Sequence, residues 1–309
     1  MASFNIEIIN DLSKNDKEIY AFADANADKD CILLTIYGAQ TKKAIAKLGL
    51  KKMVFALEFG RVFSNSKLKA FILEIDGIPE NIALIKLIRA QIALSGIPYV
   101  FFTQGEQMRS SILVASNISL KVGERIVEVL IDKDGYVVSE LEYTDKGYIE
   151  REQRDCKPYR KMTAEKIRQR ILGSNDPVKI ICHANSSGEA CTKFLTKNVL
   201  NNVPTSKLMI MEESLADYEE KFVFETVKWM FDKSYTKFYV CQLAFRNYMI
   251  KFKYGDNRYP LMVCKKDEVL PYNKVVTIPK SFLQFSVSFL YRVSLLILCY
   301  FKCFANENG

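Results

Sequence analysis

Residues 179–195 read KIICHANSSGEACTKFL and pass from an apolar run through a polar loop into a helical pattern. The apolar run Val178–Cys182 is short and rich in β-branched residues, which predicts a buried strand. The segment Gly188–Leu200 predicts a helix, which begins just after the polar loop. A strand that leads through a loop into a helix is the repeating unit of α/β folds, so this stretch predicts an α/β architecture.

The same alternation continues on both sides of this stretch. Further strands are predicted at Phe4–Ile9, Cys31–Tyr37, Ala70–Ile75, Tyr99–Phe102, Ile112–Val114, Ile126–Ile131, Tyr136–Tyr143 and Leu208–Met211. Further helices are predicted at Ala39–Leu48, at Asn81–Ser95, from a Thr163 cap to Leu172, and at Asp217–Phe231. The dipeptide Asp134-Gly135 predicts a hairpin, and the polar, alanine-rich segment Lys14–Asp30 predicts a loop or a short helix.

Composition limits the chemistry that the chain can carry. The 309 residues have a formal net charge of +8, and the lysines are spread along the chain rather than gathered into a basic stripe, so we expect no nucleic-acid partner. Eight cysteines form no Cys-x-x-Cys pair and there is one histidine, so we expect no metal site. The scattered thiols and the absence of a secretory signal predict a cytoplasmic protein.

Several segments resemble the nucleotide-binding domain of the heat-shock protein 70 family. The resemblance begins at Val54–Phe63 (VFALEFGRVF), includes the ungapped match at 179–195, and continues through EEKFVFETVKWM at 219–230. It ends at YPLMVCKKDEVLP, residues 259–271, which is similar to the start of the family's substrate-binding domain. It implies a two-lobed, actin-like ATPase (ribonuclease-H-like) α/β fold.

The resemblance also implies a domain organisation. Residues 1–255 would form the nucleotide-binding domain, residues 256–281 a remnant of the substrate-binding domain, and residues 282–309 an apolar tail. The family continues with a β-sandwich and a helical lid, for which the remaining residues leave no room. We therefore expect a truncated C-terminal stub.

The departures from the family fall on the positions that would contact nucleotide. The first phosphate loop needs Asp-x-Gly-Thr, but no glycine precedes Gly38. The resemblance places the second phosphate loop at Leu120–Glu124, where Gly123 alone remains of a triple glycine. A carboxylate on the catalytic side is replaced by the amide of Gln104, which cannot act as a base.

The adenosine loop is altered as well. The family's Gly-Gly-Ser-Thr-Arg is replaced by residues 183–187, so that side chains appear where the backbone must approach the ligand. The degenerate cleft positions of this loop are His183, Asn185, Ser186 and Ser187, and Ser187 takes the place of the arginine that stacks on adenine. Together with Gly123 and Gln104 they form the predicted nucleotide site, for which we expect no catalytic residue, no metal and no bound cofactor. Residual ATP binding stays open.

These losses predict a pseudo-ATPase that acts through protein–protein contact, with chaperones or co-chaperones as its partners. An active but divergent ATP-binding chaperone is the first alternative. A membrane-tethered interaction protein is the second, because residues 282–304 are mostly apolar and about as long as a membrane is thick. Arg292 interrupts that run, so a buried remnant of the lost domain and a translated non-exonic sequence also remain open.

Overall fold

A computed structural model describes residues 18–26, 30–63, 67–76, 81–157, 159–173, 176–184, 188–244, 247–254, 257–270 and 285–289. The chain divides into two compact units. The larger comprises residues 1–76 and 83–240, and the smaller comprises residues 77–82 and 241–309. The domain boundaries at residues 255 and 281 stay predictions.

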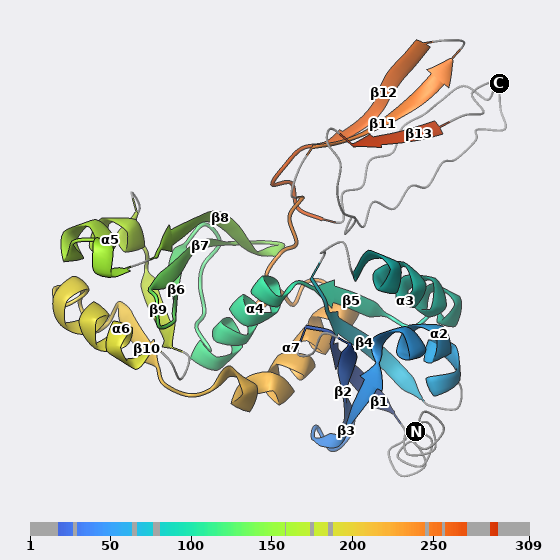
Figure 1. Ribbon diagram of the computed structural model, residues 1–309, viewed down its shortest axis with the longest axis horizontal. Coiled ribbons are helices and arrows are strands. Elements are labelled where there is room, and N and C mark those ends of the chain that lie inside the picture. The colour runs from blue at the N-terminus through green and yellow to red at the C-terminus, as the bar shows by residue number, and fades with distance from the viewer. Residues whose placement is uncertain are drawn as a thin grey trace. The chain divides into compact units, whose positions relative to one another are not determined.

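The first sheet of the larger unit has the strand order β3-β2-β1-β4-β5 (Figure 1). A meander of three antiparallel strands is followed by two strands that continue parallel to the first. The helices α2 (Lys52–Val62) and α3 (Ile82–Ser95) make the connections β3-α2-β4 and β4-α3-β5. The strands are β1 (Ile19–Asp24), β2 (Cys31–Gly38), β3 (Ala44–Lys51), β4 (Leu68–Glu74) and β5 (Tyr99–Phe102).

The second sheet repeats this arrangement with the order β10-β9-β6-β7-β8. Its first three strands again form an antiparallel meander, and the last two run parallel to the first. Its strands are β6 (Arg125–Ile131), β7 (Tyr136–Thr144), β8 (Gly147–Cys156), β9 (Lys179–Ala184) and β10 (Leu208–Met211). Its crossover helices are α5 (Ala164–Leu172) and α6 (Glu189–Phe194), the latter extended by a π-helical turn at Leu195–Val199. This duplication is the two-lobed actin-like ATPase fold, as the resemblance implied.

Two further helices are α4 (Gln104–Ser116), which connects the first half to the second along the chain, and α7 (Glu219–Phe231), which follows the last strand of the second sheet. On α7, Phe222 contacts Phe22 of β1 and Phe102 of β5 edge to face, with ring centroids 6.0 and 5.7 Å apart. On α4, Ile112 and Leu113 pack with residues of the second sheet in one buried cluster. Short 3-10 helices lie at Tyr159–Lys161 and Leu215–Tyr218.

The helical stripe predicted for residues 81–95 is confirmed. Leu84, Ile85, Ile88 and Ile92 of α3 are buried, and the helix is followed by Gly96 at φ +67°. The strands predicted around residues 31–37, 70–75, 99–102, 126–131, 136–143, 178–182 and 208–211 are confirmed with small shifts at their ends, as is the hairpin at Asp134-Gly135. The predicted helices near 163–172, 188–200 and 217–231 are also present.

Three predictions of secondary structure are wrong. Ala39–Leu48 was expected to be a helix, but β3 occupies residues 44–51, where buried Leu48 and Leu50 alternate with exposed neighbours at the two-residue period of a strand. The apolar run Ile112–Val114 was expected to be a strand but lies within α4. The segment Lys14–Asp30 contains strand β1, and the strand predicted at Phe4–Ile9 lies outside the described residues.

The smaller unit contains a three-stranded antiparallel sheet with the order β12-β11-β13. Its strands are β11 (Tyr248–Tyr254), β12 (Asn257–Cys264) and β13 (Phe285–Phe289). Of the predicted apolar tail at 282–304, only 285–289 belong to the described residues, and they form β13. In the described part of the chain, no helix combines the length and apolar character that crossing a membrane requires.

Candidate functional site

Ligands of open α/β sheets gather at the carboxyl ends of the parallel strands. In the first sheet β1, β4 and β5 end at Asp24, Glu74 and Phe102, and we call this the first edge. In the second sheet β6, β9 and β10 end at residues 131, 184 and 211, and we call this the second edge. At each edge the chain turns from the first strand of its sheet into the second, so the duplicated fold has two equivalent turns.

At the first edge, Asn26 joins the ends of β1 and β4. Its backbone N–H donates to Asp24 Oδ1 at 2.7 Å, and its side-chain amide donates to Glu74 Oε1 at 3.4 Å. Its side-chain oxygen accepts from the backbone N–H of Asp76 at 3.2 Å. The start of the turn, at Asn26, is therefore held by polar groups at the ends of β1 and β4.

The beginning of α4 lies at the same edge, and a helix N-terminus attracts anions. Here Asp76 Oδ1 accepts from the N–H of Gln104 at 3.0 Å. Thr103 Oγ1 accepts from the N–H of Glu106 at 3.3 Å, and Glu106 Oε2 accepts from the N–H of Thr103 at 2.8 Å, which completes a capping box. The anion at this helix N-terminus is thus a carboxylate of the chain.

The first edge is strongly acidic. Burial first, and then the neighbouring charge of Asp24, raise the pKa of Glu74 to about 7 against the opposing hydrogen bond from Asn26. Asp24 and Asp76 add two more carboxyl groups. Each ionised carboxylate at this edge opposes a further negative charge nearby, and Asp24 and Asp76 in this way help to raise the pKa of Glu74.

The raised pKa of Glu74 makes stability depend on pH. Between its ordinary value of 4.5 and about 7, native Glu74 keeps a proton that the unfolded chain has released, so stability falls as the pH rises through this window. We expect Glu74→Gln to raise the free energy of unfolding by about 2 kcal/mol at pH 8 and to change it little at pH 4. Urea unfolding at both pH values measures this, and an equal effect at both would contradict it.

At the second edge, the turn between β6 and β7 binds its own carboxylate. Asp132 Oδ1 accepts from the backbone N–H groups of Asp134 at 2.7 Å and Gly135 at 3.0 Å, and Asp132 Oδ2 is paired with the Lys157 ammonium. Partial burial would raise the pKa of Asp132, but the hydrogen bonds from Lys157 and the two N–H groups outweigh it and lower that pKa. The backbone donors of this turn are therefore engaged within the protein.

Two glycines at the second edge serve internal packing. A Cβ on Gly135 would lie 2.4 Å from the Cys156 carbonyl oxygen, and a Cβ on Gly188 would lie 2.9 Å from the Ile131 carbonyl oxygen. Glycine lets backbone approach closely at both positions. The group that approaches is in each case another part of this chain.

The predicted nucleotide positions are distributed over the fold. His183 lies on β9 beside Leu130 of β6, where its Nε2 is 3.2 Å from the Glu213 carbonyl oxygen and burial lowers its pKa. Gly123 precedes β6 and donates its N–H to the Tyr143 carbonyl oxygen, so roughly 20 Å of strand separates it from the level of His183. The structure therefore does not bring these two together.

The remaining predicted positions are divided as well. Gln104 begins α4 at the first edge, where its N–H is bound by Asp76. Asn185, Ser186 and Ser187 lie outside the described residues. Four residues of the first edge were not predicted from the sequence: Asp24, Asn26, Glu74 and Asp76. The pattern that could have indicated them is a polar residue at the end of an apolar run, as in β1 and β4.

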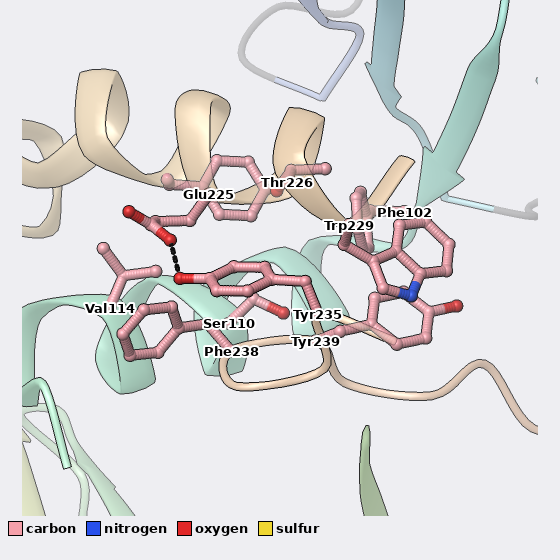
Figure 2. Close-up of a pocket in the computed structure, with 10 residues that line it drawn as sticks. Phe102, Ser110, Val114, Glu225, Thr226, Trp229, Tyr235, Phe238 and Tyr239 are labelled. Atoms are coloured by element: carbon pink, nitrogen blue, oxygen red, sulfur yellow. Dashed lines mark hydrogen bonds between the residues drawn. The ribbon is translucent and has the colours of Figure 1, made fainter. Parts of the chain in front are cut away.

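A small cavity lies between α4, α7 and residues 235–239 (Figure 2). Trp229 and Tyr239 stack beside it with ring centroids 3.7 Å apart, and the Tyr235 hydroxyl donates to the Glu225 carboxylate. The cavity has a volume of about 10 Å³, which is room for one water molecule. The Ser110 hydroxyl lines it, is buried and has no hydrogen-bond partner within the part of the chain that the structure describes. A nucleotide does not fit here.

No protein-family model and no curated protein matches this sequence. Among solved structures, the chain is similar to a Bacteroides thetaiotaomicron protein of unknown function with an actin-like ATPase fold, at 10% identity over 67% of this chain and 97% of that one, with a TM-score of 0.35. It is similar to the ROK hexokinase of Thermus thermophilus at 8% identity over 67% of this chain and 97% of that one, with a TM-score of 0.39. It is similar to the PPX-GPPA enzyme of Aquifex aeolicus at 11% identity over 54% of this chain and 68% of that one, with a TM-score of 0.31. At these TM-scores the similar structures do not indicate an activity. The actin-like ATPase fold is identified from the strand order that the two sheets share.

Proposed function

We propose that this chain is a non-catalytic, heat-shock-70-like protein that acts by binding other proteins. The observation that carries the proposal is the turn between β6 and β7. Its N–H groups at Asp134 and Gly135 donate to Asp132, and that carboxylate is also paired with Lys157. A phosphate cradle needs backbone N–H groups that point at the ligand, whereas these point at the protein's own carboxylate.

The first edge supports the same proposal. Its helix N-terminus is bound by Asp76, and its carboxyl groups surround a buried Glu74. Phosphoryl transfer depends on positive groups and metal ions that neutralise developing charge. Among the described residues, no group of three or more His, Cys, Asp or Glu side chains is arranged to hold a metal ion. A fold of this kind, whose β6–β7 turn binds the chain's own carboxylate, suits a scaffold that acts through its surface.

The partners that we propose are chaperones or co-chaperones, in the cytoplasm, and no cofactor takes part. This assignment rests on the resemblance of residues 54–63, 179–195 and 219–230 to the heat-shock protein 70 family. The order of strands and helices in the larger unit is compatible with it.

Thermal unfolding of the full chain with and without nucleotide tests the proposal. Because a ligand that binds only the native state raises the unfolding midpoint by mass action, we expect no shift at millimolar Mg²⁺-ATP or Mg²⁺-ADP. Mg²⁺ alone and AMP serve as matched controls. A rise of several degrees with Mg²⁺-ATP that neither control reproduces would overturn the proposal and favour an active, divergent ATP-binding chaperone.

A further inference from the structure

The helices α2 and α3 are apolar on their outer faces as well as on their inner faces. Their inner residues, such as Phe55 of α2 and Ile88 of α3, are buried against the first sheet. On the outside of α2, Met53 and Leu57 are 48% and 62% exposed, and on α3 Leu94 is 84% exposed. A surface helix of a globular protein ordinarily presents polar residues to water.

These exposed residues belong to one surface. Both helices run back along the first sheet between parallel strands, and Figure 1 shows them beside each other. A Cβ on Gly60 of α2 would lie 3.4 Å from the side-chain oxygen of Gln91 on α3, which fixes the level at which the helices face each other. Leu57 lies one turn before Gly60, and Leu94 lies one turn after Gln91. The α2/α3 surface comprises Met53, Val54, Leu57, Gly60, Ala90 and Leu94.

The charges on these two helices are almost all positive. Lys86 is exposed and Lys52 is half-buried, and the one acidic residue, Glu58, is half-buried. The Arg89 guanidinium lies over the Phe101 ring of β5, 5.0 Å from its centroid, and is not counted with this surface. Lys51, directly before α2, adds a further positive charge and is exposed. A complementary partner therefore carries acidic groups around an apolar centre.

The shape of the residues favours a helix as the partner. Gly60 and Ala90 are small and exposed, which lets the backbone of another helix come close, and Met53 adapts to an apolar neighbour. The strongly exposed side chains of this surface include no aromatic residue, whereas Trp and Tyr mark surfaces that lie in a membrane interface. We propose that the α2/α3 surface binds an amphipathic helix of a partner protein whose apolar face is flanked by Asp and Glu.

The inference deepens the proposed function, since it rests on the chain acting by protein contact, and two synthetic helical peptides test it. Both carry the same stripe of Leu and Ala, flanked by Glu in one peptide and by Lys in the other. Fluorescence anisotropy with the full chain is expected to give an affinity at least tenfold higher for the Glu peptide. We expect Leu57→Glu combined with Leu94→Glu to weaken that binding at least tenfold. Val122→Glu is the matched control, because Val122 is 67% exposed in the turn before β6, and it is expected to leave binding unchanged.

Each other outcome overturns the inference. The proposal fails if the Glu peptide does not bind, if both peptides bind equally, or if the double variant binds as the parent does. Vesicles of anionic lipid that bind the parent but not the double variant would assign the surface to a membrane. A parent that sediments as a dimer while the double variant sediments as a monomer would assign it to a second copy. The two proposals are tested separately. A rise of the unfolding midpoint with Mg²⁺-ATP contradicts the non-catalytic function, whereas the peptide titration without nucleotide tests the α2/α3 surface alone.

Discussion

Replacing Arg109 with leucine is expected to lower the free energy of unfolding by about 3–5 kcal/mol, because the change breaks a buried ion pair from one side. Arg109 lies on α4 and is 8% exposed. Its Nη2 donates to Glu150 Oε1 of β8 at 2.5 Å, and its Nε donates to Ser139 Oγ of β7 at 3.1 Å. Without the guanidinium, the Glu150 carboxylate and the Ser139 hydroxyl lose their charged partner beneath α4.

A second carboxyl group lies near Arg109. Glu128 of β6 is fully buried, and neither of its oxygens has a hydrogen-bond partner among the described residues. Burial raises the pKa of Glu128 well above its usual range, and the charge of Arg109 opposes that rise while Glu150 adds to it. Arg109 therefore lies near two acidic side chains, and its ion pair is with Glu150.

Urea unfolding measures the effect of Arg109→Leu, and Arg109→Leu combined with Glu150→Leu is the matched control. Replacing both members of a buried pair by apolar residues is often neutral, so the double variant is expected to recover most of the lost stability. If the double variant is as unstable as the single one, the loss comes from the packing of α4 rather than from an uncompensated charge. A single variant within 1 kcal/mol of the parent would show that the pair contributes little.

The parts of the fold that the sequence predicts well are those where local pattern and tertiary burial agree. In α3 the residues with helical spacing are the residues that the sheet buries, so the pattern alone locates the helix. The hairpin at Asp134-Gly135 is specified by its turn residues. Such segments carry their structural information within a few residues.

The failures have the opposite cause. Ile112–Val114 reads as a strand by its β-branched residues, but the capping box of Thr103 and Glu106, nine residues earlier, starts a helix that runs through it. In β3, the alanines and lysines favour a helix locally, but the segment forms a strand because it pairs with β2. The tertiary partner overrides propensity in both places.

The candidate site was harder still to predict. A phosphate loop is recognised in a sequence by its glycines. The polar groups at the two edges are instead carboxylates and an amide, and they come from strand ends that are far apart in the sequence. Asp24 and Glu74 are neighbours because β1 pairs with β4. No local sequence pattern predicts that pairing. Asp132 could be read as part of a turn, but its partner Lys157 lies at the end of β8 and is brought close by the meander.

Gly135→Ala is expected to cost about 3 kcal/mol of stability and to mark this glycine as a packing residue. Gly135 has φ +153°, and an added Cβ would lie 2.4 Å from the Cys156 carbonyl oxygen, which is backbone and cannot swing away. Gly123→Ala is the matched control, since Gly123 has φ +89° but open space where its Cβ would lie, so the substitution is expected to cost about 1 kcal/mol. Thermal and urea unfolding of both variants measure the difference. Equal losses would mean that backbone conformation alone requires glycine at residue 135, and the β6–β7 turn would then not be closed by the chain's own packing.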